Sequence, residues 1–147
     1  MTREVISHFL FFAERILGPL SVAYGQPTYP DDRALCETHM LARLETADGR
    51  PVTVMASVGG AQPDRQELTI KGSLASHRVS EFFIHTRSDG LAFEDVGERP
   101  KDPRATSLKA QLDELLLCLD GKPHRLSTPA EALRVQELVE MMLAGTG

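Results

Sequence analysis

The chain has 147 residues, of which 41% are hydrophobic and 25% are charged, and its formal net charge is −5. These are ordinary globular proportions and they exclude a disordered chain. Because a nucleic-acid surface needs clustered basic residues to neutralise phosphates, and no Lys/Arg cluster occurs here, we expect no nucleic-acid partner.

Membrane insertion and export are also disfavoured. The longest apolar runs, Phe9–Ala13 and Leu115–Leu119, are far shorter than the ~20 residues that span a bilayer. The N-terminus lacks the basic start, apolar block and cleavage site of a signal peptide. Two cysteines, Cys36 and Cys118, are too few for a disulfide framework or a zinc site. We therefore expect a cytoplasmic protein that forms one domain over residues 1–147 and has no membrane partner.

The first predicted element is a helix that ends at Gly18-Pro19, where glycine relieves the helix terminus and proline cannot continue it. Its apolar residues recur at the i, i+3, i+4 spacing of a buried stripe, formed by Val5, Ile6, Phe9, Leu10, Ala13, Ile16 and Leu17. Glu4 and His8 fall on a different face of this helix, one turn apart.

A β-rich region follows the helix. Leu20–Gly25 alternates loosely, and Gln26–Asp32 then interrupts the pattern with two prolines and two acids. His39–Thr46 and Val52–Val58 are predicted strands, and Asp48-Gly49 between them predicts an antiparallel hairpin because both residues tolerate positive φ. In the second of these strands, one face carries valines and alanine and the other carries polar residues and a methionine, namely Thr53, Met55 and Ser57.

Three further strands are predicted before the chain becomes polar. Glu67–Lys71 and Ser76–Ser80 are separated by Gly72-Ser73, and Phe82–Arg87 follows. Val96–Arg104 then reads as a proline-bearing loop.

Two helices are predicted at the end of the chain. Ser107–Leu119 has leucines at helical spacing, and Cys118 within it is expected to be a small core residue. The final helix has a capping box, in which Thr128 caps the helix, Pro129 takes the first helical position and Glu131 completes the box. Its buried side is expected to consist of Leu133, Leu138, Val139, Met142 and Leu143.

The order of elements predicts the fold class. One helix, several hairpin-connected strands and two more helices indicate an α+β fold, with an open, mostly antiparallel β-sheet and helices packed on one face. The other sheet face is then solvated or covered by a partner.

His8 and Glu4 are the candidate catalytic residues. A carboxylate one helical turn away can orient an imidazole and raise its proton affinity, which suits acid–base chemistry at neutral pH. The alternative is an exposed i, i+4 pair worth about 0.3–0.5 kcal/mol. The other histidines, His39, His77, His85 and His124, share no ligand spacing and are read as surface residues, so no metal site is predicted.

Two other motifs bear on ligand binding. Asp31-Asp32 could contact a polar substrate or serve as turn residues. Gly59-Gly60 is not followed by a G-x-G-x-x-G pattern, so the chain has no phosphate-binding loop of its own.

Four stretches together resemble the C-terminal, substrate-side domain of the glucose–fructose oxidoreductase / inositol dehydrogenase (Gfo/Idh/MocA) family. Glu4–Gly18 resembles the catalytic helix, with an acid, three residues, a histidine and an apolar stretch ending in Leu-Gly. Val52–Gly59 resembles the strand after the central hairpin, Glu67–Val79 the two strands joined at a glycine, and Ser127–Leu143 the closing helix.

The resemblance implies a fold and an activity. The implied fold is the dihydrodipicolinate-reductase-like C-terminal domain, whose open sheet closes the substrate cleft and often forms the oligomer interface. The implied activity is NAD(P)-dependent oxidation or reduction at the CH–OH group of a sugar, cyclitol or related polyol. His8 matches the catalytic histidine and Glu4 the usual aspartate, while Phe11 stands where many members have aspartate.

The resemblance also implies partners. The family's N-terminal Rossmann domain, which holds NAD or NADP, has no counterpart in these residues, so we expect that missing domain, a small polyol-like substrate and a second copy joined through the sheet face. We expect the isolated chain to bind no cofactor and to be inactive. The alternative hypothesis is a non-catalytic module that uses its open sheet face for oligomerisation or small-ligand binding.

Overall fold

The computed structural model describes residues 1–32 and 34–146, which form two compact units. Unit 1 consists of Met1–Ala61 and Ser127–Gly147, and unit 2 consists of Gln62–Leu126. The prediction of a single domain over residues 1–147 stays a prediction, since compact units of this kind occur both within one domain and as separate domains.

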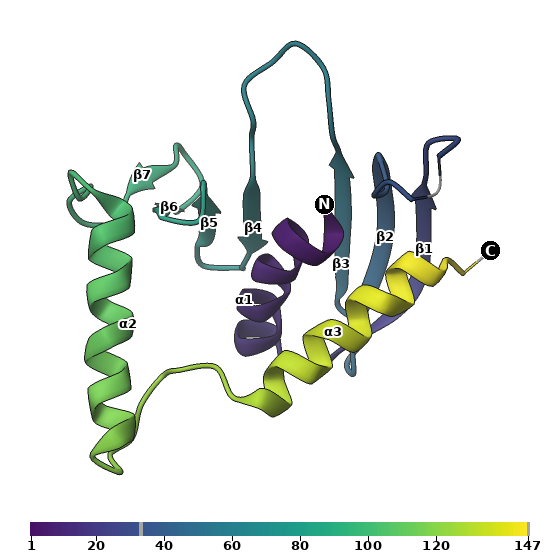
Figure 1. Cartoon of the computed structure of the whole chain (residues 1–147). Coiled ribbons are helices and arrows are strands. Elements are labelled where there is room, and N and C mark those ends of the chain that lie inside the picture. The colour runs from purple at the N-terminus through teal and green to yellow at the C-terminus, as the bar shows by residue number, and fades with distance from the viewer. Residues whose placement is uncertain (33, 147) are drawn as a thin grey trace. The chain divides into compact units, whose positions relative to one another are not determined.

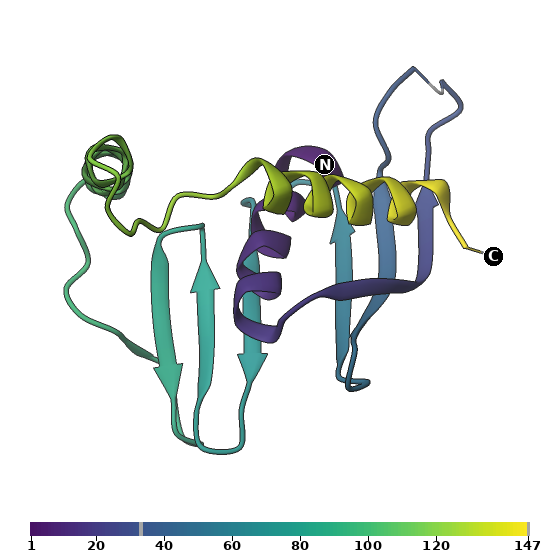
Figure 2. The same ribbon diagram turned by 90° about the horizontal axis from the view of Figure 1, so that it is seen from below.

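Unit 1 contains a three-stranded antiparallel sheet in the order β1-β2-β3, with helices α1 and α3 on one of its faces (Figures 1 and 2). Its elements are η1 (Thr2–Ile6), α1 (Ser7–Leu17), β1 (Leu20–Thr28), β2 (His39–Thr46), β3 (Pro51–Ser57) and α3 (Pro129–Ala144). The hairpin predicted between β2 and β3 is present, and Gly49 in its turn has φ 80°. Alternation in β2 directs Met40, Ala42 and Leu44 into the core beneath the helices.

Strand β1 is longer than predicted, because it continues through Gln26 and Pro27 to Thr28. The two prolines in Gln26–Asp32 predict that this strand ends at Gly25. Proline is tolerated here because β1 is an edge strand, in which every second N–H faces away from the neighbouring strand and is not needed for pairing.

The first helix begins as a π-helix, since Thr2–Ile6 forms a π-helical segment that continues directly into α1. It ends at Gly18, as predicted, and Gly18 adopts φ 89°. Ile6, Leu10 and Ala13 of the predicted stripe are buried. Ile16 was predicted to be buried as well, but it is 59% exposed, because it lies in the last turn of α1, beyond Ala13, the last buried residue of that helix.

Helix α3 has the predicted cap. The Thr128 hydroxyl accepts a hydrogen bond from the Glu131 N–H at 3.2 Å, and the Glu131 carboxylate accepts one from the Thr128 N–H at 2.7 Å. The buried side consists of Val135, Leu138, Val139, Met142 and Leu143. Leu133, which was predicted to be buried, is 60% exposed, and the buried stripe begins two residues later, at Val135.

Unit 2 contains a four-stranded antiparallel sheet in the order β4-β5-β6-β7 and helix α2. Its elements are β4 (Glu67–Lys71), β5 (Ser76–Ser80), β6 (Ile84–Ser88), β7 (Glu94–Asp95) and α2 (Pro103–Leu119). The first two strands have the predicted bounds. Strand β6 starts two residues later than predicted because Glu81 and Phe82 form the turn before it, with φ 51° and 63°.

Helix α2 starts four residues earlier than predicted. Asp102 caps it by accepting a hydrogen bond from the Ala105 N–H at 3.0 Å, and Pro103 takes the first helical position. No residue of α2 is buried, and Cys118, predicted to be a core residue, is exposed. The predicted α+β class with antiparallel sheets and helices is confirmed, with the strands divided between two sheets.

Among the helices of the described residues, none is both long enough and apolar enough to cross a membrane.

Replacing Thr128 with alanine should lower the free energy of unfolding by about 0.5–2 kcal/mol, because the Glu131 N–H loses its capping partner. Urea unfolding followed by circular dichroism measures this change. Ser127→Ala, which alters the residue next to the cap, serves as the matched control and should leave the midpoint unchanged. Equal stability of wild type and Thr128→Ala would show that the capping box does not stabilise α3.

Candidate functional site

The two predicted catalytic residues lie at the start of unit 1. Glu4 belongs to the π-helical segment η1 and His8 is the second residue of α1, and both side chains are exposed. Helices widened to i→i+5 hydrogen bonding are rare and occur frequently at functional sites. Here the Ser7 N–H bonds back to the Thr2 carbonyl, so the widened turn lies directly before His8.

The helix changes from π to α between Glu4 and His8. The expectation that Glu4 orients His8 rests on their four-residue separation, which is close to one helical turn. His8 has an interaction of its own. The catalytic roles of both residues stay predictions.

Glu37 anchors the beginning of η1. This side chain comes from the connection between β1 and β2, is only 3% exposed, and accepts a hydrogen bond from the Thr2 N–H at 2.5 Å. The Met1 amino nitrogen lies 3.4 Å from the same carboxylate oxygen. Burial, the largest single influence, raises the pKa of Glu37, but hydrogen bonding at Thr2 and at the Glu37 backbone and the charge of the Met1 amino group together outweigh it and bring the pKa down to about 2.

Three bidentate ion pairs connect the first helices to α3. Arg3 contacts Glu140 with two hydrogen bonds of 2.8 Å, and Arg15 contacts Glu131 at 2.9 and 3.0 Å. Hydrogen bonding to Arg3 lowers the pKa of Glu140. Hydrogen bonding to Arg15 is the largest influence that lowers the pKa of Glu131 to about 2. These planar two-point contacts fix how η1 and α1 are rotated against α3.

The third of these pairs lies at the end of α1. Arg134 donates to both oxygens of Glu14 at 2.6 and 3.2 Å. Glu14 also accepts a hydrogen bond from the Leu20 N–H at 3.0 Å, which ties the end of α1 to the start of β1.

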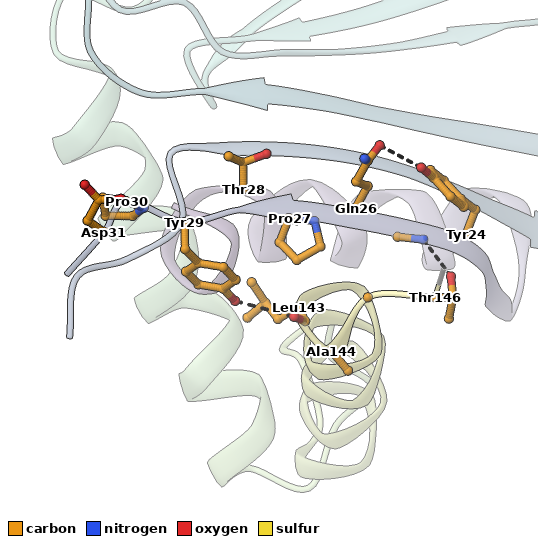
Figure 3. A pocket seen from close by; sticks show the side chains of 12 residues that line it. Tyr24, Gln26, Pro27, Thr28, Tyr29, Pro30, Asp31, Leu143, Ala144 and Thr146 are labelled. Carbon is orange, nitrogen blue, oxygen red and sulfur yellow. Dashed lines mark hydrogen bonds between the residues drawn. The ribbon is translucent and has the colours of Figure 1, made fainter. Parts of the chain in front are cut away.

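A pocket of about 750 Å³ lies in unit 1 between the end of β1 and the end of α3 (Figure 3). One wall is the segment from Tyr24 to Asp31, and the opposite wall is the segment from Leu143 to Thr146. Tyr24 donates its hydroxyl hydrogen to Gln26 at 2.7 Å, so both polar groups are held in place at the rim. The pocket therefore offers hydroxyl, amide and carboxylate groups to a polar ligand.

The structure gives different roles to the two acidic residues Asp31 and Asp32. Asp31 lines the pocket, as the substrate-contact reading requires. Asp32 accepts a hydrogen bond from the Ala34 N–H at 2.9 Å, which is the turn chemistry of the alternative reading. Neither His8 nor Glu4 lines this pocket, so it is separate from the predicted catalytic pair.

Of the remaining histidines, the structure brings two together. His77 on β5 and His85 on β6 approach with Nδ1 and Nε2 3.0 Å apart. From the sequence they are predicted to be unrelated surface residues, because their eight-residue separation matches no ligand spacing within one element. The pairing of β5 with β6 brings the two histidines together. Aligning the two predicted strands as an antiparallel hairpin would have revealed this proximity from the sequence.

Comparison with known proteins identifies the fold. No protein-family profile matches the sequence, and no curated protein sequence matches it at a significant level. Among solved structures, a dehydrogenase (MviM) from Clostridium difficile superimposes with a TM-score of 0.74 at 10% identity, over 95% of this chain and 46% of that chain.

Two further solved structures are similar. The WlbA dehydrogenase from Bordetella pertussis, in complex with NADH and UDP-GlcNAcA, has a TM-score of 0.67 at 16% identity and is matched over 43% of its length by 95% of this chain. A mutant of KijD10, a 3-ketoreductase from Actinomadura kijaniata in complex with TDP-benzene and NADP, has a TM-score of 0.66 at 18% identity, over 97% of this chain and 46% of that chain. The chain thus has the fold of rather less than half of each protein.

The Glu37 anchor predicts a pH dependence of stability. Its pKa is about 2 in the folded chain and 4.5 for the free side chain, so its contribution is complete above pH 4.5 and is lost as the pH falls towards 2. A shift of this size corresponds to about 3 kcal/mol. Urea unfolding of wild type and Glu37→Gln at intervals between pH 7 and pH 2 measures it.

The Glu37→Gln variant should be less stable at pH 7 and should show a flatter dependence on pH in this range. Glu45→Gln, which alters an acid of the neighbouring strand, is the control and should keep the wild-type slope. A wild-type slope in Glu37→Gln would contradict the anchoring role.

Proposed function

We propose that this chain is the substrate-side domain of a cytoplasmic NAD(P)-dependent oxidoreductase of the Gfo/Idh/MocA type, acting on the CH–OH group of a sugar, cyclitol or related polyol. The observation that carries the proposal is the structural likeness, over 95–97% of the chain, to three proteins described as dehydrogenases or a ketoreductase. Two of those structures contain NADH or NADP. The sequence resemblance of the helix around His8 to the family's catalytic helix supports it independently.

The cofactor does not fit the described residues of this chain. Dinucleotides bind where parallel strands lead through a glycine-rich turn into a helix, so that the helix N-terminus meets the pyrophosphate. Every strand pair in the described residues is antiparallel. In our proposal the cofactor is therefore held by a Rossmann domain outside these residues, and the expectation that this chain by itself binds none remains a prediction.

His8 is the proposed acid–base residue. Its side chain is exposed, as proton exchange with a substrate requires, and it lies on the helix that the three ion pairs and the Glu37 anchor hold in place. In the proposed reaction the His8 ring takes the proton of the substrate hydroxyl when the alcohol is oxidised and returns it when the ketone is reduced. Glu4, an exposed carboxylate one helical turn away, supports the positive charge that forms on His8.

A second candidate function is assembly through the open face of the unit 1 sheet. Leu41 and Met55 lie directly opposite each other on β2 and β3 and are 43% and 79% exposed. Both point away from the face that the helices cover. Apolar side chains gathered on an uncovered sheet face favour association with another surface.

Substituting His8 by alanine tests the catalytic proposal. In an enzyme expressed from the whole reading frame around this chain, turnover should fall by about 10²–10⁴-fold because the hydroxyl proton has no acceptor. Nicotinamide absorbance with a panel of sugars and polyols reports the rate. The DNA upstream of the Met1 codon should encode a G-x-G-x-x-G turn and a later Glu-Lys-Pro.

His39→Ala is the matched control, because His39 is also an exposed histidine of unit 1, and it should keep the wild-type rate. Unchanged turnover in His8→Ala would remove His8 from the mechanism. A stop codon and a ribosome-binding site directly before Met1 would favour the assembly module instead.

Replacing Met55 with glutamate tests the assembly function. If the open face joins two copies, the variant should elute as a monomer at concentrations where the wild type is a dimer, because a charge cannot be buried there without a partner. Light scattering coupled to size exclusion gives the masses. Met141→Glu, which places the same change on an exposed position of α3, should leave the dimer intact. A monomeric wild type at high concentration contradicts this function.

A further inference from the structure

The histidine pair of unit 2 lies on one face of the β4–β7 sheet. Strand β5 pairs with β6 so that His77 is opposite Arg87 and Val79 is opposite His85. Directly opposite residues share a face, so His77 and His85 are diagonal neighbours on the same surface. Both side chains are exposed, so their contact is not imposed by packing in a core.

The two rings meet through their nitrogens. His77 Nδ1 and His85 Nε2 are 3.0 Å apart, and the ring centroids are 5.2 Å apart with the planes inclined by 30°. In this arrangement one nitrogen donates a hydrogen bond to the lone pair of the other. When neither of these two nitrogens carries a hydrogen, both lone pairs face the space between the rings.

The nitrogen separation suits a transition-metal ion. Two metal–nitrogen bonds of about 2.0–2.1 Å place their nitrogens about 2.9 Å apart at a right angle and about 3.3–3.4 Å apart in a tetrahedron. The observed 3.0 Å falls between these values, near the right angle that Cu²⁺ and Ni²⁺ prefer. Because both rings are exposed, small rotations of each are enough to direct the two nitrogens at a shared ion.

We propose that His77 and His85 form a binding site for a divalent transition-metal ion, with Cu²⁺ bound most tightly. No third His, Cys, Asp or Glu joins them within the described part of the chain, so water completes the coordination. Such a two-ligand site is open and exchangeable. The ion links β5 to β6, and binding therefore stabilises the hairpin that carries both ligands.

The neighbouring charges set the strength of the site. Arg87 lies opposite His77 and repels a cation, whereas Glu94 lies opposite Arg87 on β7 and partly offsets that charge. Ile70 and Val79 are the other directly opposed residues, and they contribute no charge. Exchanging Arg87 for glutamine should therefore tighten metal binding by roughly two- to fivefold at low salt.

Titration of the untagged chain with CuCl₂ tests the proposal by calorimetry and electron paramagnetic resonance. We expect one ion per chain, a spectrum with two nitrogen ligands, a raised unfolding temperature, and weaker binding at pH 5, because the ligands must be unprotonated. His77→Ala and His85→Ala should each weaken binding at least tenfold. His77→Gln and His85→Gln, which keep a hydrogen-bonding side chain, should do the same.

His39→Ala and His124→Ala are the controls, since both remove exposed histidines from elsewhere in the chain, and binding should be unchanged in each. The unfolding temperatures of all variants in EDTA show whether each one is folded. Binding that survives His85→Ala and His85→Gln, or no binding below about 1 mM Cu²⁺ in the wild type, would overturn the proposal.

Discussion

The close approach of α3 to strand β1 is the constraint on which unit 1 depends. A Cβ atom at Gly25 would lie 2.8 Å from the Met142 carbonyl oxygen, so only glycine allows the helix to reach the sheet at this point. The same approach brings Thr146 beside Gly25, where its N–H and its hydroxyl oxygen bond to the Gly25 carbonyl and N–H at 2.9 Å each. The close contact at Gly25 therefore shapes both the packed core and the wall of the pocket.

Charged pairs then orient the helix that carries His8 on that core. The Arg3–Glu140 and Arg15–Glu131 pairs are partly exposed, and Arg134 pairs with a Glu14 side chain that is only 10% exposed. Exposed ion pairs of this kind contribute little to stability. Their bidentate geometry, however, permits only one rotation of α1 against α3. His8 is thereby presented on the helix-covered side of the sheet, and Met55 on the uncovered side. The proposed catalytic and assembly functions would use different surfaces, so the two proposals are compatible in one chain.

The elements whose bounds were predicted to within a few residues are those that depend on interactions between residues close in sequence. Alternation defines β2, β4 and β5, and the capping box starting at Thr128 defines the beginning of α3, because these patterns depend on neighbours within one turn or one strand. Pro27 was wrongly predicted to end the strand, because whether a proline can lie within β1 depends on β1 being an edge strand. Cys118 and Leu133 were misread because spacing identifies an apolar stripe but not the surface that covers it.

The candidate site divides in the same way. The sequence by itself singled out His8 and Glu4 as the candidate catalytic pair, by residue type and by their place on one helix. Tertiary structure alone decided which distant residues meet: Glu37 reaches Thr2 across 35 positions, and strand register joins His77 to His85. Such relations depend on the backbone path between distant segments. Local spacing carries no information about that path until the strands are paired and the helices are packed.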